Sequence, residues 1–262
     1  MVQANKDADK DYESILNLIK NLKNVKANRF VLISTIGIFE DFGAVNDEHS
    51  TKFEKILAYG KNRRFLEKFV INQFHKIHII RLPALFGRNI KKNFLFDLLN
   101  PAPTFLRSNK FNSLMGLIST KEQSLLKFYY KRVNNNFHLN RSIFLNSNDK
   151  LQLINILNEY EASSIYFHST KSTYQFYNLS YLWNDIKRVI DYDLDVSHFA
   201  TEPISAREIY LEVLKKEMPL TNAKIHKENM ITKYSNIWES GNYIRKAGDI
   251  MNDIKRFYQN NL

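Results

Sequence analysis

The pattern of apolar and polar residues predicts alternating helices and buried strands in the first third of the chain. In residues 11–22 apolar side chains recur at steps of three and four, which is typical of an amphipathic helix. Residues 29–40 and 76–87 each contain a short, nearly continuous apolar run, as expected for strands buried on both faces. Residues 57–74, between them, have the helical period again. This order predicts an α/β fold with a parallel sheet flanked by helices.

The alternation stops at Asn100–Pro103, where two prolines break the chain. We expect residues 100–170 and 206–262 to form a smaller, mostly helical substrate-binding lobe. Residues 171–205 return to a strand, a helix and a strand, so we expect them to join residues 1–99 in the sheet domain.

Charge and cysteine content limit the classes of site. The 262 residues include 38 Lys and Arg against 27 Asp and Glu, which gives a formal net charge of +11. A basic balance suits nucleic acid, an anionic membrane or a phosphorylated substrate. The basic residues are scattered, however, and are densest at Lys61, Arg63, Arg64 and Lys68, so a nucleic-acid partner is not favoured. The chain has no cysteine, which excludes disulfides and zinc–thiolate sites, and we predict no metal site.

The sequence also predicts where the protein is found. No apolar run reaches the roughly 20 residues that a membrane-spanning helix needs. The first residues lack the apolar core of a signal peptide. We therefore expect a cytoplasmic protein without a membrane partner.

Four segments carry polar side chains at strand ends or at the start of a helix. They are Ser34–Thr35, the helix residues Tyr59-Gly60-x-x-Arg63 with Glu67, the turn Arg81-x-Pro83-x-x-x-Gly87, and the pair of segments 174–183 and 198–209. In this order and at these spacings, they resemble the extended short-chain dehydrogenase/reductase family of NAD-dependent sugar-nucleotide epimerases, dehydratases and reductases. The resemblance covers residues 3–205 and implies a Rossmann-like sheet.

The resemblance implies a catalytic role for three residues. Tyr59 would give or take a proton at a carbonyl or hydroxyl of the sugar. A tyrosine phenol ordinarily titrates near pH 10, so a neighbouring cation, here Arg63, would favour the phenolate. The Thr35 hydroxyl would hold the substrate oxygen by a hydrogen bond.

The resemblance also implies ligands and supporting residues. Ser34 and Arg81 would support the site or bind substrate, and Pro83 would contact the cofactor together with Tyr59 and Arg63. The cofactor would be NAD or NADP, and the substrate a nucleotide sugar.

Two departures from the family pattern change this expectation. Arg63 stands where the family usually has lysine; it supplies positive charge but stays protonated, so it cannot relay a proton. The glycine-rich turn that holds the cofactor pyrophosphate at a helix N-terminus is also absent from the sequence. We therefore expect an incomplete Rossmann-like sheet and an incomplete cofactor site.

Three functions stay open at this point. The first is an NAD(P)-dependent enzyme acting on a nucleotide sugar in polysaccharide or cell-surface sugar biosynthesis, N-terminally truncated in this sequence. The second is an inactive remnant that serves as a binding or structural subunit. The third is a basic α/β protein that binds nucleic acid.

An incomplete parallel sheet predicts a measurable physical property. Such a sheet leaves an apolar edge and an uncovered face. We expect this chain to be poorly stable alone, to form a homodimer, or to bind a complementary N-terminal segment. Thermal unfolding combined with sedimentation analysis tests this expectation, and a monomer that melts sharply would contradict it.

Overall fold

The computed structural model describes residues 1–238 and 240–261, which form two compact units. Unit 1 comprises Met1–Ile90, Thr173–Ser205 and His226–Phe257, and unit 2 comprises Lys91–Ser172, Ala206–Ile225 and Tyr258–Leu262. The stretch that the sequence assigned wholly to the lobe, residues 206–262, is thus divided between the two units.

Unit 1 consists of a parallel sheet, its flanking helices and several short strands. Its elements are α1 (Val2–Lys6), α2 (Ala8–Leu22), β1 (Phe30–Thr35), the 3-10 helix η1 (Ile36–Ile38), α3 (Ala58–Gln73), β2 (Ile77–Leu82), β3 (Ala84–Phe86), β7 (Thr173–Tyr174), β8 (Phe176–Asn178), η3 (Leu179–Tyr181), α9 (Leu182–Asp191), β9 (Val196–His198), β10 (Ile204–Ser205), η4 (Ser235–Ile237) and α11 (Ala247–Gln259, in unit 1 as far as Phe257).

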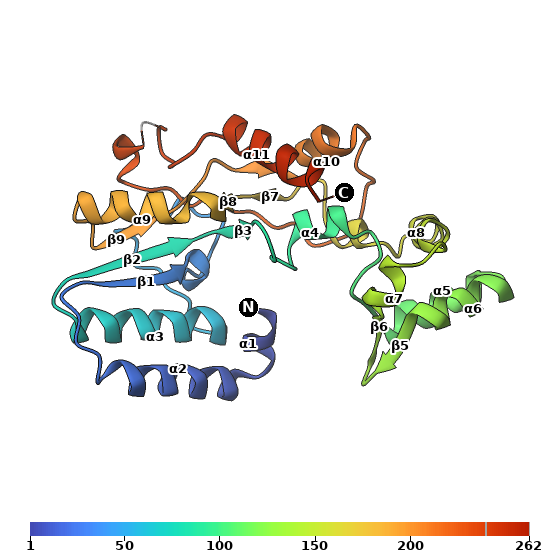
Figure 1. The fold of residues 1–262 in the computed structure, drawn as a ribbon, viewed down its shortest axis with the longest axis horizontal. Coiled ribbons are helices and arrows are strands. Elements are labelled where there is room, and N and C mark those ends of the chain that lie inside the picture. Colours follow the sequence, from blue (N-terminus) through green and yellow to red (C-terminus); the bar gives the residue numbers. More distant parts are fainter. Residues whose placement is uncertain (239, 262) are drawn as a thin grey trace. The chain divides into compact units, whose positions relative to one another are not determined.

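The central sheet has the strand order β1-β2-β9, and both pairs are parallel. Helices α2 and α3 lie on one face of the sheet, and α9 lies on the other (Figure 1). The predicted α/β fold, a parallel sheet flanked by helices, is confirmed. The parallel pairing also places the carboxyl ends of all three strands at one edge of the sheet.

The period-3.6 pattern of the two N-terminal helices explains how they attach to the sheet. Ile15 and Ile19 of α2 and Leu66 and Val70 of α3 are buried together against Ile79 of β2. Residues spaced three or four apart lie on one side of a helix, so each helix turns one apolar stripe toward the strands. This packing fixes the orientation of α3, which carries most of the predicted site.

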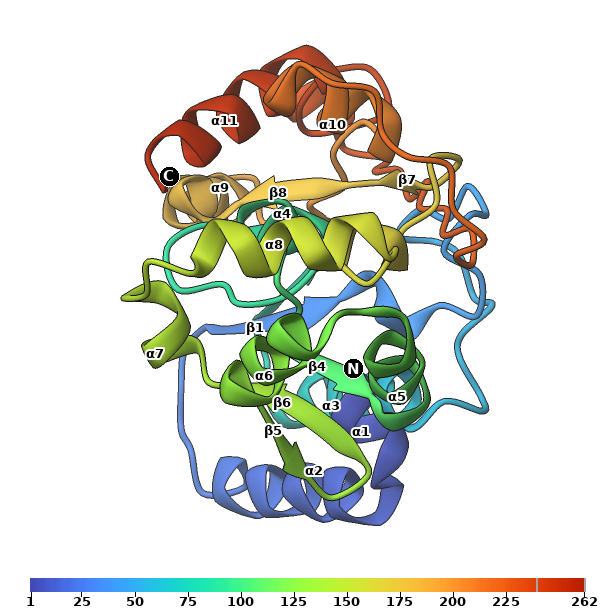
Figure 2. The ribbon, with the colours of Figure 1, turned by 90° about the vertical axis from the view of Figure 1, so that its right-hand side faces the viewer.

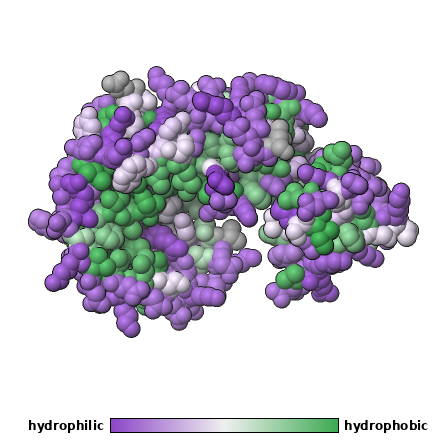
Figure 3. Space-filling view, in the orientation of Figure 1, coloured by the Kyte–Doolittle hydropathy of each residue, from purple (hydrophilic) through white to green (hydrophobic). Residues whose placement is uncertain are grey.

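Strand β1 is less buried than its sequence predicts. Every residue of β2 is buried, whereas Ile33 of β1 is 46% exposed. Apolar surface gathers over the part of unit 1 where β1 and β2 lie (Figure 3). The physical reason is that β1 is at the edge of the sheet: within the described residues it pairs only with β2. The expectation of a strand buried on both faces is therefore wrong for β1.

Two glycines allow the first turn of α3 to contact the end of β1. A Cβ on Gly60 would lie 2.3 Å from the Gly37 carbonyl oxygen and 2.9 Å from Cβ of Glu54, closer than real atoms approach. The segment between η1 and α3 returns to this point through the backbone hydrogen bond from Glu54 to Ile38 (2.8 Å). The Glu54 carboxylate then accepts hydrogen bonds from the backbone N–H groups of Ile56 and Leu57.

Unit 2 is mostly helical and includes a small antiparallel sheet of order β4-β6-β5 (Figure 2). Its elements are α4 (Phe94–Leu99), β4 (Phe105–Arg107), α5 (Ser108–Leu117), α6 (Thr120–Tyr129), β5 (Tyr130–Val133), β6 (Asn136–Leu139), α7 (Arg141–Leu145), α8 (Lys150–Glu159), η2 (Ser164–Phe167) and α10 (Ala206–Leu214). Residues 121–133 carry a helical pattern in the sequence, but the helix ends at Tyr129. Strands β5 and β6 then form a hairpin whose turn contains Asn134 at φ 53°.

Replacement of Gly60 by alanine tests the close approach of α3 to η1. The added Cβ meets a backbone oxygen that cannot move independently, so we expect Gly60→Ala to lower the free energy of unfolding by about 1–3 kcal/mol. Gly248→Ala is the matched control, because a Cβ there meets nothing within 4 Å; alanine in a helix should stabilise by up to about 1 kcal/mol. Equal denaturant midpoints for the two variants would contradict this account.

Candidate functional site

A row of polar side chains crosses the carboxyl edge of the central sheet. Ser34 of β1 lies in register with Arg81 of β2, and Arg81 lies in register with His198 of β9. Residues in register on neighbouring strands point to the same face of a sheet. In this case they share the face with Glu67 of α3, to which Ser34 and Arg81 bind.

Glu67 is the centre of this row and is fully buried. Its carboxylate accepts hydrogen bonds from Arg81 Nε (3.0 Å) and Nη2 (2.9 Å), from Ser34 Oγ (2.6 Å) and from Arg64 Nη1 (2.7 Å). Burial alone would raise the pKa of Glu67, but the Arg81 guanidinium and the hydrogen bonds from Ser34 and Arg64 outweigh it and lower the pKa. Glu67 is thus a buried carboxylate that joins a helix to two strands.

His198 extends the row and is held as a neutral imidazole. Its Nδ1 lies 3.0 Å from the Ile231 carbonyl oxygen, which can only accept, so Nδ1 carries the hydrogen. The Nε2 atom is then the acceptor for Arg81 Nη1 at 3.2 Å. Burial lowers the pKa of His198; the Glu48 carboxylate opposes this effect, the positive charge of Arg81 adds to it, and the pKa lies below its ordinary value.

Glu48 ties the segment between η1 and α3 to the end of β9. Its carboxylate accepts hydrogen bonds from the backbone N–H of His198 (2.7 Å), the Thr232 hydroxyl (2.6 Å) and the backbone N–H of Lys233 (2.9 Å). This contact closes the loop that comes before Tyr59 in the chain.

Tyr59 and Thr35 come together around Gly37. A Cβ on Gly37 would lie 3.0 Å from Cε1 of the Tyr59 ring and 3.2 Å from Thr35 Oγ1. Thr35 Oγ1 accepts a hydrogen bond from the Gly37 backbone N–H (3.0 Å), and Asn5 Oδ1 accepts one from the Tyr59 backbone N–H (2.8 Å). Within residues 1–238 and 240–261, the Tyr59 hydroxyl makes no hydrogen bond. The structure therefore brings together two of the three residues that the sequence predicts to be catalytic.

Arg63 is the third predicted catalytic residue, and it lies over the ring of Tyr59. Its guanidinium carbon is 4.7 Å from the ring centroid, a cation–π distance. Arg63 Nη1 also contacts both carboxylate oxygens of Asp11 at 2.7 and 2.9 Å, and Asn62 donates to Asp11 as well. Burial would raise the pKa of Asp11, but the contacts from Arg63 and Asn62 hold it below its ordinary value. The positive charge beside Tyr59 is thus already paired.

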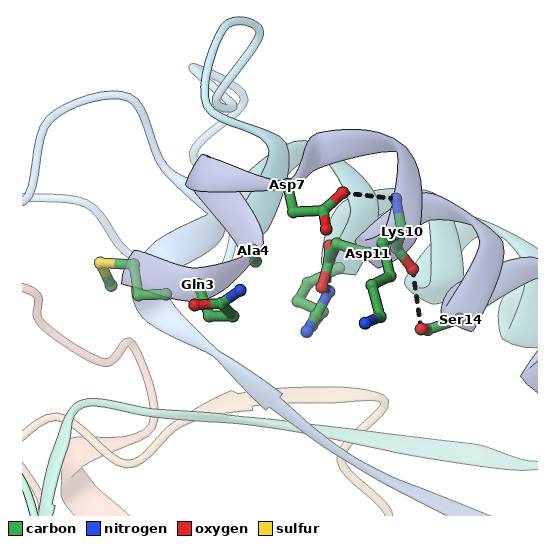
Figure 4. A pocket seen from close by; sticks show the side chains of 8 residues that line it. Gln3, Ala4, Asp7, Lys10, Asp11 and Ser14 are labelled. Carbon is green, nitrogen blue, oxygen red and sulfur yellow. Dashed lines mark hydrogen bonds and ion pairs between the residues drawn. The ribbon is translucent and has the colours of Figure 1, made fainter. Parts of the chain in front are cut away.

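A cavity of about 300 Å³ opens beside Arg63, lined by residues of α1 and α2. Gln3, Lys10, Asp11 and Ser14 extend into it from the same side of these helices (Figure 4). Its polar lining combines an amide, a hydroxyl and charges of both signs. The cavity could therefore hold a polar ligand next to Arg63.

The remaining predicted residues have different surroundings. Ser34 and Arg81, predicted to support the site or bind substrate, are both bonded to Glu67. Pro83, a predicted cofactor contact, is buried between β2 and β3, one residue beyond the register pair Thr35 and Leu82. A cofactor contact at Pro83 stays a prediction.

Sequence reasoning missed three residues that organise the site: Asp11, Glu48 and His198. Asp11 lies in the first turn of α2, where a carboxylate is normal at a helix N-terminus, so nothing in its local sequence marks it. His198 could have been found once the register of β2 and β9 was known. Glu48 lies in the loop between η1 and α3, where the sequence has no period of apolar residues that would mark it.

Neither a known family model nor a curated protein sequence matches this chain. Solved structures do match. A UDP-N-acetylglucosamine 4-epimerase from Methanobrevibacter ruminantium M1, in complex with UDP-N-acetylmuramic acid, is 9% identical with a TM-score of 0.54 over 94% of this chain and 67% of its own. A UDP-glucuronic acid 4-epimerase from Bacillus cereus with NAD is 12% identical, with a TM-score of 0.53 over 94% of this chain and 65% of its own. RMD from Pseudomonas aeruginosa, complexed with NADPH, is 10% identical, with a TM-score of 0.55 over the whole of this chain and 78% of its own.

These similarities show that the chain shares its fold with these two epimerases and with RMD. The chain spans about two thirds of the length of the two epimerases. At these identities, the shared property is the fold.

The start of α2 does not fit the phosphates of a dinucleotide. A pyrophosphate is held by free backbone N–H groups and positive potential at a helix N-terminus. The start of α2 instead has Asp7 as its N-cap, bonded to the Lys10 N–H, and carries Asp9 and Asp11 in its first turn. Among residues 1–238 and 240–261, no group of three His, Asp or Glu side chains could hold a metal, and no helix is long and apolar enough to cross a bilayer.

The neutral state of His198 predicts acid sensitivity. The pKa of His198 is lowered on folding, so below about pH 6.5 the unfolded chain binds more protons, and the free energy of unfolding falls as the pH falls. One such group contributes a slope of at most about 1.4 kcal/mol per pH unit. His198→Gln keeps a donor for Ile231 and an acceptor for Arg81, and it should flatten the slope measured by urea unfolding between about pH 7.5 and 5.5. Identical slopes for the wild type and His198→Gln would contradict this assignment.

Proposed function

We propose that this protein acts on a nucleotide sugar in NAD(P)-dependent chemistry of the epimerase, dehydratase or reductase type. The observation that carries the proposal is the packing of the Tyr59 ring and the Thr35 hydroxyl around Gly37, with Arg63 over the ring. This arrangement lies at the carboxyl edge of the sheet, where α/β folds bind ligands. The similarity of the fold to sugar-nucleotide epimerases and reductases supports the proposal.

In this proposal Tyr59, Thr35 and Arg63 have different roles in proton transfer. The Tyr59 hydroxyl, which has no partner among the described residues, gives a proton to a sugar carbonyl oxygen or takes one from a sugar hydroxyl. Thr35 positions the same oxygen by a hydrogen bond. Arg63 offsets negative charge that develops on Tyr59. The ion pair between Arg63 and Asp11 weakens this electrostatic effect.

The nicotinamide dinucleotide would need a site for its pyrophosphate, and the start of α2, with Asp7, Asp9 and Asp11, does not supply one. We therefore expect its affinity for this chain to be weak, with a Kd above about 1 mM. Below this Kd, the rate of hydride transfer should rise linearly with the concentration of NAD(P)H and should not saturate.

A second function, a non-catalytic nucleotide-sugar-binding subunit, is favoured by two observations. The Arg63 charge is paired with Asp11, and the start of α2 opposes a bound phosphate. Such a subunit would keep the fold and the sugar contacts but transfer no hydride.

Replacement of Tyr59 by phenylalanine tests the first function. The assay follows the oxidation of millimolar NADH or NADPH by a 4-keto nucleotide sugar. We expect Tyr59→Phe to lower the rate of this oxidation by about 10²–10⁴-fold, because the proton donor is lost while the packing of the ring is kept. Tyr192→Phe, at an exposed tyrosine that ends α9, should leave the rate unchanged.

The same samples separate the two functions. Saturation-transfer NMR on UDP sugars reports binding independently of turnover. Binding without turnover in the wild type would favour the subunit function. A protein that neither binds nor converts any nucleotide sugar would overturn both.

A further inference from the structure

Helix α3 carries a second polar face that the proposed catalytic residues do not use. Lys61, Arg64, Phe65 and Lys68 follow the three- and four-residue spacing that places side chains on one side of a helix. By the same spacing, Tyr59 lies on the opposite side. Apart from Arg63, which lies over the Tyr59 ring, the densest basic cluster in the sequence is thus separate from the Tyr59 site.

This face forms one wall of a cavity of about 640 Å³ within unit 1. The start of α2 and residues 51–58 form the other walls. The rings of Tyr12 and Phe65 meet there with centroids 5.8 Å apart, and both side chains are partly exposed. The cavity therefore offers an open aromatic surface rather than a closed core.

The charges around the cavity are mainly positive. Lys55, Lys61 and Lys68 line it, and among the described residues none of them makes an ion pair. Two carboxylates, Glu54 and Asp9, also line it. Glu54 is occupied by the backbone N–H groups at the start of α3, so Asp9 is the remaining uncommitted acid.

Arg64 connects the aromatic and the charged parts of the cavity. Its guanidinium lies 4.0 Å from the centroid of the Phe53 ring, and its Nη1 is bonded to Glu67. Its Nε is buried and has no hydrogen-bond partner among residues 1–238 and 240–261. A stacked guanidinium fixed in this way is a preorganised cation at the cavity wall.

We propose that this cavity binds a nucleoside diphosphate. The base would stack on Tyr12 and Phe65, since every base presents a π-face to an aromatic side chain. The phosphates would be held by Lys61, Lys68 and Arg64, because charge-assisted hydrogen bonds to phosphate are the strongest available here. A nucleoside diphosphate carries about three negative charges at neutral pH, which matches the three unpaired lysines. The volume of the cavity accommodates a ligand of this size.

Lysine labelling with pyridoxal phosphate, an aromatic phosphate that forms an imine with lysine, locates the site directly. After borohydride reduction and peptide mass spectrometry, we expect Lys61 or Lys68 to be modified about tenfold faster than Lys187, an exposed lysine on α9. UDP or ADP should slow the modification at these lysines by about tenfold and leave Lys187 unaffected.

Two variants complete the test. The double variant Lys61→Gln with Lys68→Gln should weaken UDP binding in calorimetry by about tenfold or more, whereas Lys187→Gln should not change it. Tyr59→Phe should leave labelling and protection unchanged, so the outcome does not depend on the proposed catalytic function.

Equal labelling of Lys61, Lys68 and Lys187, or labelling that nucleotides do not slow, would overturn the proposal. Sedimentation at the labelling concentration distinguishes one further outcome. A dimer in which Lys61 and Lys68 are unreactive would show that a second copy of the chain covers this face, which also overturns the proposal.

Discussion

The geometry of unit 1 depends on one buried carboxylate. Glu67 accepts hydrogen bonds from Ser34 and Arg81 on two strands and from Arg64 on its own helix. Removing one partner from a buried ion pair costs several kcal/mol, because the other charge stays behind in a low dielectric. The network therefore tolerates few other positions of α3 over the sheet.

The position of Tyr59 follows from this constraint together with a steric one. Glu67 sets how α3 lies over β1 and β2, and Gly60 lets the first turn of the helix approach Gly37. Tyr59 is next to Gly60, so its ring has to lie beside Gly37 and Thr35. The candidate proton donor is thus placed by packing and a salt bridge, without needing a bond at its own hydroxyl.

The sequence predicted those parts of the fold that depend on local patterns. The helical period gave α2 and α3, the apolar runs gave β1 and β2, and their alternation gave a parallel sheet. It did not predict that Ile33 is half exposed, because burial depends on what lies beside a strand, and β1 is at the sheet edge. The hairpin of β5 and β6 was missed because tertiary packing overrides the weak local preference of two four-residue strands.

The site was predicted unevenly for a similar reason. Tyr59, Arg63 and Thr35 carry a recognisable spacing along the chain, and the structure brings them together. Asp11 and His198 are brought in by contacts between distant segments, 52 residues from Arg63 in the first case and 117 from Arg81 in the second. Single-sequence reasoning has no access to such pairs before the strand order is known.

The free edge of β1 has a consequence for aggregation. Strand β1 begins with four apolar residues, and within the described residues its outer edge pairs with no other strand, so it is a template for uncontrolled strand stacking. Two basic residues, Lys26 and Arg29, come just before the strand, where they act as gatekeepers. If identical copies stacked in parallel register, these charges would lie directly against each other and repel. This repulsion disfavours in-register fibrils made of copies of this chain. A strand from another protein with acidic residues before it would not be repelled in this way.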